Sequence, residues 1–272
     1  MGLRINTNVA ALNAARTLRR TTLDLNVNLE RLSSGLRINR AKDDAAGLAI
    51  SEGFRTVIRG SLVAQRNSQD GISLLQTAEG TLTETTNMLQ RIRELAVQSA
   101  NGTMSAANRT ALQQEVDQLF EQIDQIANRT EFNGLYPLQA AGSITLQTGF
   151  RQGDTMLVTT TAATTAALGL TGINITTQAG AQAALTTVDS ALAATTAVRS
   201  QLGAQQNRLE YTISTLAIQE ENSSSSDSML RDADIARETI SFTRNQILVS
   251  SGTSVLAQSN VIPQTALQLL GG

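Results

Sequence analysis

Carboxylates and hydroxyls are the main groups in this sequence that could carry chemistry, because its 272 residues contain neither cysteine nor histidine. The chain therefore has no thiolate nucleophile, no imidazole base and no ordinary zinc site. Asp43 and Asp44 are adjacent and follow a lysine, so we interpret them as surface ion-pair partners. Asp232, Asp234 and Glu238 lack the glycine-containing loop that surrounds a calcium ion. The residue types predict no enzyme, no cofactor and no metal site.

Charge and hydropathy argue against two further classes of partner. The chain carries 21 basic and 23 acidic residues and only 3% aromatic residues. A nucleic-acid-binding protein more often shows a basic excess with aromatic stacking partners, so we expect no nucleic acid. No run of 18 apolar residues is present, which argues against a membrane-spanning helix. The first residues, MGLRIN, lack the apolar core of a signal peptide, so we expect no cleaved leader.

Aliphatic residues at alternating spacings of three and four predict long, packed helices. The first such row ends at Ser33–Gly35, where glycine can terminate a helix. Further rows cover residues 75–96, 112–126 and 185–216. The first row consists of Ala11, Ala15, Leu18, Thr22, Leu25, Leu29, Leu32 and Leu36.

The C-terminal segment differs from the other predicted helices because it has almost no charge. Arg244 is the only charged residue between positions 239 and 272. A helix without a solvated face is buried, either at the centre of its own domain or against other chains, and the position at the chain end favours other chains. Two rows of apolar residues recur seven apart: Ile235, Phe242, Val249, Leu256 and Leu270, and Leu248, Val255, Ile262 and Leu269.

Residues 130–180 interrupt the helical pattern. Alternating and β-branched residues at 143–146 and 155–160 predict a hairpin, and Phe132-Asn133-Gly134 predicts a turn before it. The Thr/Ala-rich stretch 159–167 is expected to be an exposed surface segment. The predicted fold is mostly α: an elongated antiparallel helical bundle or coiled coil, with the N- and C-terminal helices paired and a small β-hairpin insertion.

Long segments at both ends of the chain resemble bacterial flagellins. The resemblance covers roughly residues 1–135 and 180–272, in order, and the large variable outer domains of longer flagellins are missing. Its sequence words are MGLRINTN at residues 1–8, ERLSSGLRINRAKDDAAGLAI at 30–50, RNSQDGISLLQTAEG at 66–80, QRIRELAVQSA at 90–100, LGAQQNRL at 202–209, DADIARE at 232–238 and GTSVLAQSN at 252–260.

The resemblance implies a structural protein that is exported unfolded by the flagellar type III apparatus and polymerises into the filament used for swimming. It also implies an extracellular location and three partners besides the chain itself: an export chaperone, the filament cap and the hook-junction proteins. A hook–filament junction protein of the same superfamily is the alternative within this assembly. A coiled-coil scaffold that is never exported is the alternative outside it.

The resemblance further implies two concentric domains. Residues 1–44 and 236–272 would form the inner coiled-coil domain with its linker. Residues 45–235, with a small β region at 131–180, would form the outer helical bundle. The residues expected to drive inner-core polymerisation are Leu18, Leu25, Leu32, Leu248, Val255, Ile262 and Leu269, and those expected to form a subunit contact in the linker are Arg37, Arg40, Asp43 and Asp44.

A host-receptor motif is also implied by the resemblance. In flagellins detected by the flagellin-sensing Toll-like receptor, a Gln-Arg-x-Arg-Glu-Leu-Ala-Val segment is central, and here it occupies residues 90–97. Arg91 and Leu95 match the contact positions, and Glu115 on the next helix matches a third. We expect Arg91 and Leu95 to share an outward face, four residues apart, beside the face that packs in the bundle.

Overall fold

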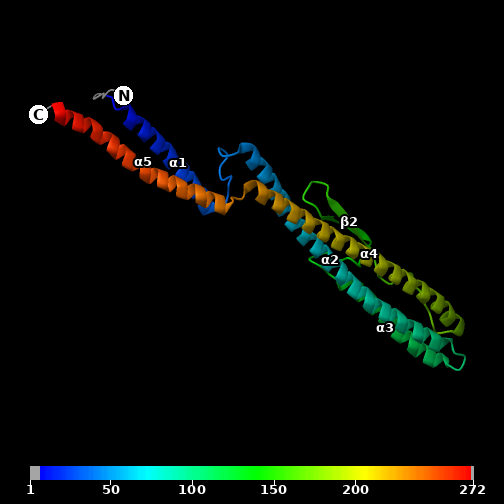
Figure 1. The fold of residues 1–272 in the computed structure, drawn as a ribbon. Coiled ribbons are helices and arrows are strands. Elements are labelled where there is room, and N and C mark those ends of the chain that lie inside the picture. Colours follow the sequence, from blue (N-terminus) through cyan, green and yellow to red (C-terminus); the bar gives the residue numbers. More distant parts are fainter. Residues whose placement is uncertain (1–6, 271–272) are drawn as a thin grey trace. The chain divides into compact units, whose positions relative to one another are not determined.

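The computed structural model describes the backbone of residues 7–270 and the side chains of residues 7–261. This part of the chain holds five helices and one two-stranded sheet, so the predicted mostly α fold with a small β-hairpin is confirmed (Figure 1). The elements are α1 (Val9–Ser34), α2 (Ala45–Ala100), α3 (Ala106–Arg129), β1 (Gly142–Gln147), β2 (Thr155–Thr160), α4 (Gln178–Arg231) and α5 (Ile235–Leu270).

Two compact units share the chain. Unit 1 combines residues 1–56 with residues 222–272, and unit 2 comprises residues 57–221. Their boundaries lie inside α2 and α4, whereas the helices themselves break at 35–44 and 232–234. The assignment of these parts to inner and outer layers stays a prediction. No helix within residues 7–270 is both long and apolar enough to span a bilayer.

Unit 1 contains the predicted pair of terminal helices, α1 and α5, side by side (Figure 1). Asn8 caps α1 by accepting a hydrogen bond from the backbone of Ala11 at 3.0 Å. Gly35 ends the helix in the left-handed region, at φ 71°, as the sequence predicted. The amide of Asn8 donates to the carbonyl of Ser259 at 2.7 Å, whereas Asn28 bonds Asn245, so the two helices run antiparallel.

The contact seam of α1 differs from the predicted row at alternate positions. Leu18, Leu25 and Leu32 are half-buried as expected, but the buried residues between them are Thr21 and Asn28. Two heptad rows pass through Leu18, Leu25 and Leu32. One includes Thr21 and Asn28 between them, and the other includes Thr22 and Leu29. The sequence favoured the second row because it is the more apolar. The structure adopts the first because Asn28 finds hydrogen-bond partners on α5. The expected seam residues Ala15, Thr22 and Leu29 are exposed instead.

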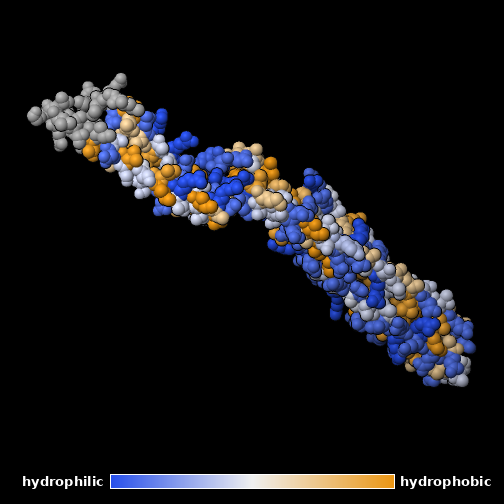
Figure 2. All heavy atoms as spheres, in the orientation of Figure 1, coloured by the Kyte–Doolittle hydropathy of each residue, from blue (hydrophilic) through white to orange (hydrophobic). Residues whose placement is uncertain are grey.

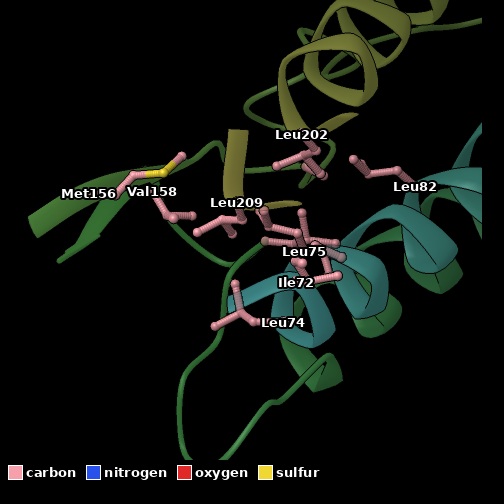
Figure 3. Packing of buried hydrophobic residues seen from close by; sticks show 12 residues of the cluster. Ile72, Leu74, Leu75, Leu82, Met156, Val158, Leu202 and Leu209 are labelled. Atoms are coloured by element: carbon pink, nitrogen blue, oxygen red, sulfur yellow. The ribbon is translucent and has the colours of Figure 1, made fainter. Parts of the chain in front are cut away.

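Unit 2 packs α2, α3, α4 and the hairpin around two clusters of mostly aliphatic side chains. Gln65 of α2 bonds Glu220 of α4, whereas Arg93, later on α2, pairs with Asp189, earlier on α4, so these helices are antiparallel. One cluster brings α2, α4 and β2 together (Figure 3). Its labelled members are Ile72, Leu74, Leu75, Leu82, Met156, Val158, Leu202 and Leu209. A second cluster joins α2, α3 and α4 and includes Leu89, Ile92, Leu95, Val116, Ile123, Leu170 and Val188.

The hairpin follows the predicted segments closely. β1 and β2 pair antiparallel, with Ser143 opposite Thr159 and Leu146 opposite Met156. Inward residues of β2 alternate with exposed ones, because one face of the sheet packs on the helices. Upstream, Asn133 (φ 50°) and Gly134 (φ 79°) form the tight turn that Asn-Gly signals.

The segment after the hairpin is anchored rather than wholly exposed, which corrects the expectation for the Thr/Ala-rich stretch. Ala163, Leu170 and Ile175 are 2%, 1% and 0% exposed. Both oxygens of Asp124 on α3 accept hydrogen bonds from Thr165, from its backbone N–H and its hydroxyl, each at 2.7 Å. Alanine and threonine gave no periodic signal, so only the tertiary partners reveal this attachment.

Candidate assembly surfaces

The residues expected to drive inner-core polymerisation fall into two groups. Leu18, Leu25 and Leu32 line the seam between α1 and α5 and are half-buried within the chain. Leu248 and Val255 point away from that seam and are 48% and 55% exposed. The side chains of Ile262 and Leu269 lie outside the described residues. Pairing of the terminal helices therefore accounts for Leu18, Leu25 and Leu32, whereas Leu248 and Val255 remain exposed within the described part of the chain.

Apolar side chains are exposed along both terminal helices (Figure 2). On α5, Thr239, Ile240, Thr243, Arg244, Ile247 and Leu248 line a shallow groove of about 430 Å³ whose surface is mostly apolar. Large exposed apolar patches on a helix mark sites where a protein meets a partner. The exposed apolar residues of the two helices within residues 7–261 are Val9, Leu12, Leu23, Leu29, Ile235, Ile240, Ile247, Leu248, Val255 and Val261.

The linker between α1 and α2 binds its own chain through each of the four predicted contact residues. Arg37 donates to the carbonyl of Leu230 at 2.7 Å, and Arg40 pairs with Glu30 at 2.6 Å. Asp44 caps α2 by accepting from the backbone of Gly47 at 2.8 Å. These in-chain contacts were not part of the sequence prediction, and they account for the local order of the linker.

Asp43 completes a tight turn in the linker. One of its carboxylate oxygens accepts hydrogen bonds from the backbone N–H groups of Asn39 and Arg40, at 3.3 and 3.0 Å. These bonds, chiefly the one from Arg40, lower the pKa of Asp43 from its ordinary value of 3.8. The turn is therefore held by the ionised carboxylate.

Arg231, at the end of α4, is a residue that sequence reasoning missed. Its backbone carbonyl accepts from the N–H of Arg37 at 2.6 Å, and its guanidinium donates to the carbonyl of Ile38 at 3.3 Å and pairs with Glu52 at 3.5 Å. Ile38 is only 3% exposed beneath it. Arg231 thus connects the linker between α1 and α2, and the short segment between α4 and α5, to the start of α2. Its sequence position at a helix end gives no sign of this role.

The carboxylates considered for metal binding have structural partners. Asp234 caps α5 by accepting from the backbone of Arg237 at 3.1 Å, and Asp232 accepts from the hydroxyl of Ser228 at 2.6 Å. Glu238 points to α1, where Arg31 donates to it at 3.1 Å. In the part of the chain that the structure describes, no three acidic side chains converge as metal ligands would.

The three predicted receptor residues occupy two different environments. Arg91 is exposed and pairs with Glu115 on α3 at 2.8 Å and with Glu94 at 3.1 Å. The hydrogen bond that Arg91 donates to Glu115 is the main reason why the pKa of Arg91 is raised above its ordinary value. Leu95 is only 1% exposed. The expectation that Leu95 shares the outward face of Arg91 is wrong. Leu95 and Ile92 lie in one buried cluster, because α3 and α4 cover that side of α2.

Long antiparallel helices, a small hairpin and unpartnered apolar rows define a helical structural protein. Two family models extend this conclusion: the bacterial flagellin N-terminal helical region matches residues 5–143, and the bacterial flagellin C-terminal helical region matches residues 185–270. The chain belongs to the bacterial flagellin family. It is a structural protein of the flagellar filament and not an enzyme.

Curated relatives and a solved structure agree with this assignment. The chain is 46% identical to the flagellar filament 33 kDa core protein of Treponema phagedenis, over 98% of this chain and 99% of the relative. It is 46% identical to a flagellin of Halalkalibacterium halodurans with the same coverage, and 42% identical to the flagellin of Bacillus subtilis over 98% and 100%. The crystal structure of Bacillus cereus flagellin is 36% identical, with a TM-score of 0.51 over 56% of this chain and 88% of that one. These relatives favour a filament subunit over the hook–filament junction alternative.

Proposed function

We propose that the exposed apolar rows of α1 and α5 are the surfaces through which copies of this chain polymerise into the extracellular filament. The observation that carries this proposal is the exposure of Leu248 and Val255, on a helix with a single charged residue between positions 239 and 261. Fully burying one aliphatic side chain contributes roughly 1.5–3 kcal/mol, so a few such residues per contact stabilise a polymer substantially.

The same surface explains the partners that the family resemblance implies. A secreted subunit with exposed apolar rows needs an export chaperone that covers them before assembly. The cap at the growing tip and the junction proteins at the base would present equivalent apolar surfaces to these rows.

A matched pair of double variants tests polymerisation. Leu248→Ser with Val255→Ser should prevent seeded filament growth, because each serine removes aliphatic area from the contact. Leu157→Ser with Val63→Ser makes the same chemical change at residues of unit 2 that are 54% and 51% exposed, and it should leave growth largely intact. Growth is followed by light scattering and electron microscopy. Normal filaments from the α5 variant would overturn the proposal.

The linker is proposed to contact neighbouring subunits as well as its own chain. The support is the remaining exposure of Arg40, whose side chain is 62% accessible although it pairs with Glu30. Arg37, Asp43 and Asp44 lie on the same exposed turn. Arg40→Ala should weaken filaments against heat while monomers keep their melting temperature. An equal loss of thermal stability in filaments and in monomers would show that Arg40 acts only within its own chain.

Recognition by the host flagellin-sensing Toll-like receptor is a second proposed function. Its support is the exposed Arg91–Glu115 pair, which presents a guanidinium and a carboxylate on adjacent helices. Leu95 would contribute by fixing this surface from below, because it is buried.

Single variants separate contact from packing at this site. Arg91→Ala and Glu115→Ala should each weaken signalling by the monomer. Arg55→Ala, earlier on the same helix and outside the motif, breaks the exposed pair with Glu52 and serves as the control. Leu95→Ala should destabilise unit 2 by about 2–5 kcal/mol and is unsuitable as a contact probe. An unchanged dose response for both Arg91→Ala and Glu115→Ala would contradict the proposal.

A further inference from the structure

The most buried side chains of α1 are polar. Thr21 and Asn28 are 9% and 8% exposed, whereas Leu18, Leu25 and Leu32 are only half-buried. Thr21 satisfies its hydroxyl on the carbonyl of Thr17 in its own helix. Asn28 instead reaches across to α5. We propose that four side chains, Asn28, Arg31, Glu238 and Asn245, here called the polar layer, lock the register in which α1 and α5 pair.

Three hydrogen bonds connect the polar layer across the helix interface. Asn245 donates its amide to Oδ1 of Asn28 at 2.8 Å, and Asn28 donates to Oε2 of Glu238 at 2.6 Å. Arg31 donates to the other oxygen of Glu238 at 3.1 Å, with the two side chains 29% and 12% exposed. Asn28 both donates and accepts, and Glu238 accepts at both oxygens. All three hydrogen bonds can therefore form in only one alignment of α1 along α5.

The aliphatic seam positions cannot select this register by themselves. Leu18, Leu25 and Leu32 recur every seven residues, and so do Phe242, Val249 and Leu256. A slip of seven residues, about 10.5 Å along a helix, would set aliphatic against aliphatic again. The same slip would take Arg31 away from Glu238 and leave the carboxylate half-buried without that donor. An unpaired, partly buried charge is unfavourable, so the polar layer discriminates where the aliphatic residues do not.

The linkers offer a competing explanation for the register. Beside the end of α1, the N–H of Ala233 donates to the carbonyl of Gly35 at 2.9 Å, and Leu36 bridges to Asp232. If this pairing fixed the alignment, removing the polar layer would have no effect on it. The two explanations therefore predict different outcomes for the same variant. The proposal concerns helix pairing within one chain and does not depend on the proposed polymer contacts.

Engineered disulfides can report the register directly, because the chain has no cysteine of its own. A Cβ atom built on Gly252 lies 3.8 Å from Cβ of Leu18, which is the usual separation across a disulfide. Leu18→Cys with Gly252→Cys thus reports the observed register. Ala11→Cys or Leu25→Cys, each with Gly252→Cys, reports a slip of seven residues in one or the other direction. In the observed register these two pairs are separated by about 10.5 Å along the helix axis, too far to bridge.

The experiment compares cross-linking of the soluble full chain in a glutathione buffer. With the polar layer intact, the observed-register pair should cross-link at least roughly tenfold more than either slipped pair, as expected when slipping loses a hydrogen bond to a charged group. Asn28→Leu with Glu238→Leu and Asn245→Leu removes all three hydrogen bonds of the layer and should abolish most of this preference. Thr21→Leu, which fills another buried polar position outside the layer, is the matched control and should keep it.

Either of two results would overturn the proposal. One is a full preference retained after the leucine substitutions, which would assign the register to the linkers. The other is no preference in the chain with an intact layer. Should the leucine variant aggregate, Asn28→Ser with Glu238→Ser and Asn245→Ser tests the same claim, because serine stays polar but is too short to bridge the helices. The serine variant is expected to lose the preference too, and its retention would count against the proposal.

Discussion

At the scale of single residues, partners rather than residue types decide what each arginine does. Arg91 and Arg93 pair with carboxylates at the surface of unit 2. Arg109 is 7% exposed and, among the residues that the structure describes, pairs with no carboxylate; it donates to the carbonyls of Asn101 at 3.0 Å and Met104 at 3.4 Å. It thereby neutralises the carboxyl end of α2 and holds the turn into α3.

Arg109→Ala is expected to destabilise unit 2 by about 1–3 kcal/mol, because the carbonyls of Asn101 and Met104 lose their donor. Arg93→Ala removes an exposed ion pair with Asp189 and should cost less than about 1 kcal/mol. Urea denaturation followed by circular dichroism measures both. Equal effects of the two substitutions would show that Arg109 is not a structural clamp.

Asp43 makes the linker turn sensitive to acid. Its pKa is lowered in the folded chain relative to 3.8, so its contribution is complete above that value and is lost as the pH falls through the lower, folded pKa. In an NMR titration, the amide of Arg40 should shift with a midpoint below 3.8. Asp43→Asn should abolish this shift. A midpoint at or above 3.8 would contradict the role given to the backbone hydrogen bonds.

At the scale of elements, the hairpin packs closely on the helices because α2 has a glycine, Gly71, at the point of contact. A Cβ atom on Gly71 of α2 would collide with Leu146 of β1 and would lie 3.2 Å from Leu209 of α4. Gly80, on the same helix, has nothing within 4 Å of that position. Both glycines lower the helical propensity of α2 equally. Close packing requires a glycine at position 71 but not at position 80.

Gly71→Ala and Gly80→Ala therefore form a matched pair. Gly80→Ala should stabilise unit 2 by about 0.5–1 kcal/mol, because alanine favours the helix. Gly71→Ala should destabilise it by about 1–3 kcal/mol, because Leu146 and the hairpin must move. Thermal melts of the two variants measure the difference. A stabilising Gly71→Ala would mean that Leu146 repacks without cost.

At the scale of the whole molecule, each unit has a different source of stability. Unit 2 buries complete aliphatic clusters of its own, with Leu75, Leu89 and Ile92 at 0% exposure. In unit 1 the helix pair α1–α5 buries little beyond its seam, and its aliphatic residues remain largely exposed. Unit 2 is therefore expected to fold by itself, whereas the proposed polymer contacts would supply most of the burial of the terminal helices.

Deleting residues 239–272 separates these contributions. The truncated chain should keep the melting transition of unit 2, because none of its clusters includes a residue beyond 221. It should not form filaments, because α5 and its exposed rows are absent. Calorimetry and seeded polymerisation measure the two properties. Filament growth by the truncated chain would contradict the role of α5.

The sequence by itself determined the helices, the hairpin and the absence of cysteine and histidine chemistry, because heptad spacing and turn residues act locally. It also placed Leu18, Leu25 and Leu32 on the seam, since their seven-residue repeat is unambiguous. It could not place Asn28, because two heptad readings fit and only the amide and carboxylate partners on α5 select one. Nor could it tell that Leu95 is buried, since the width of the packed face of α2 depends on both α3 and α4. The tertiary structure decided these points because burial and hydrogen bonding are settled between helices that lie far apart in the chain.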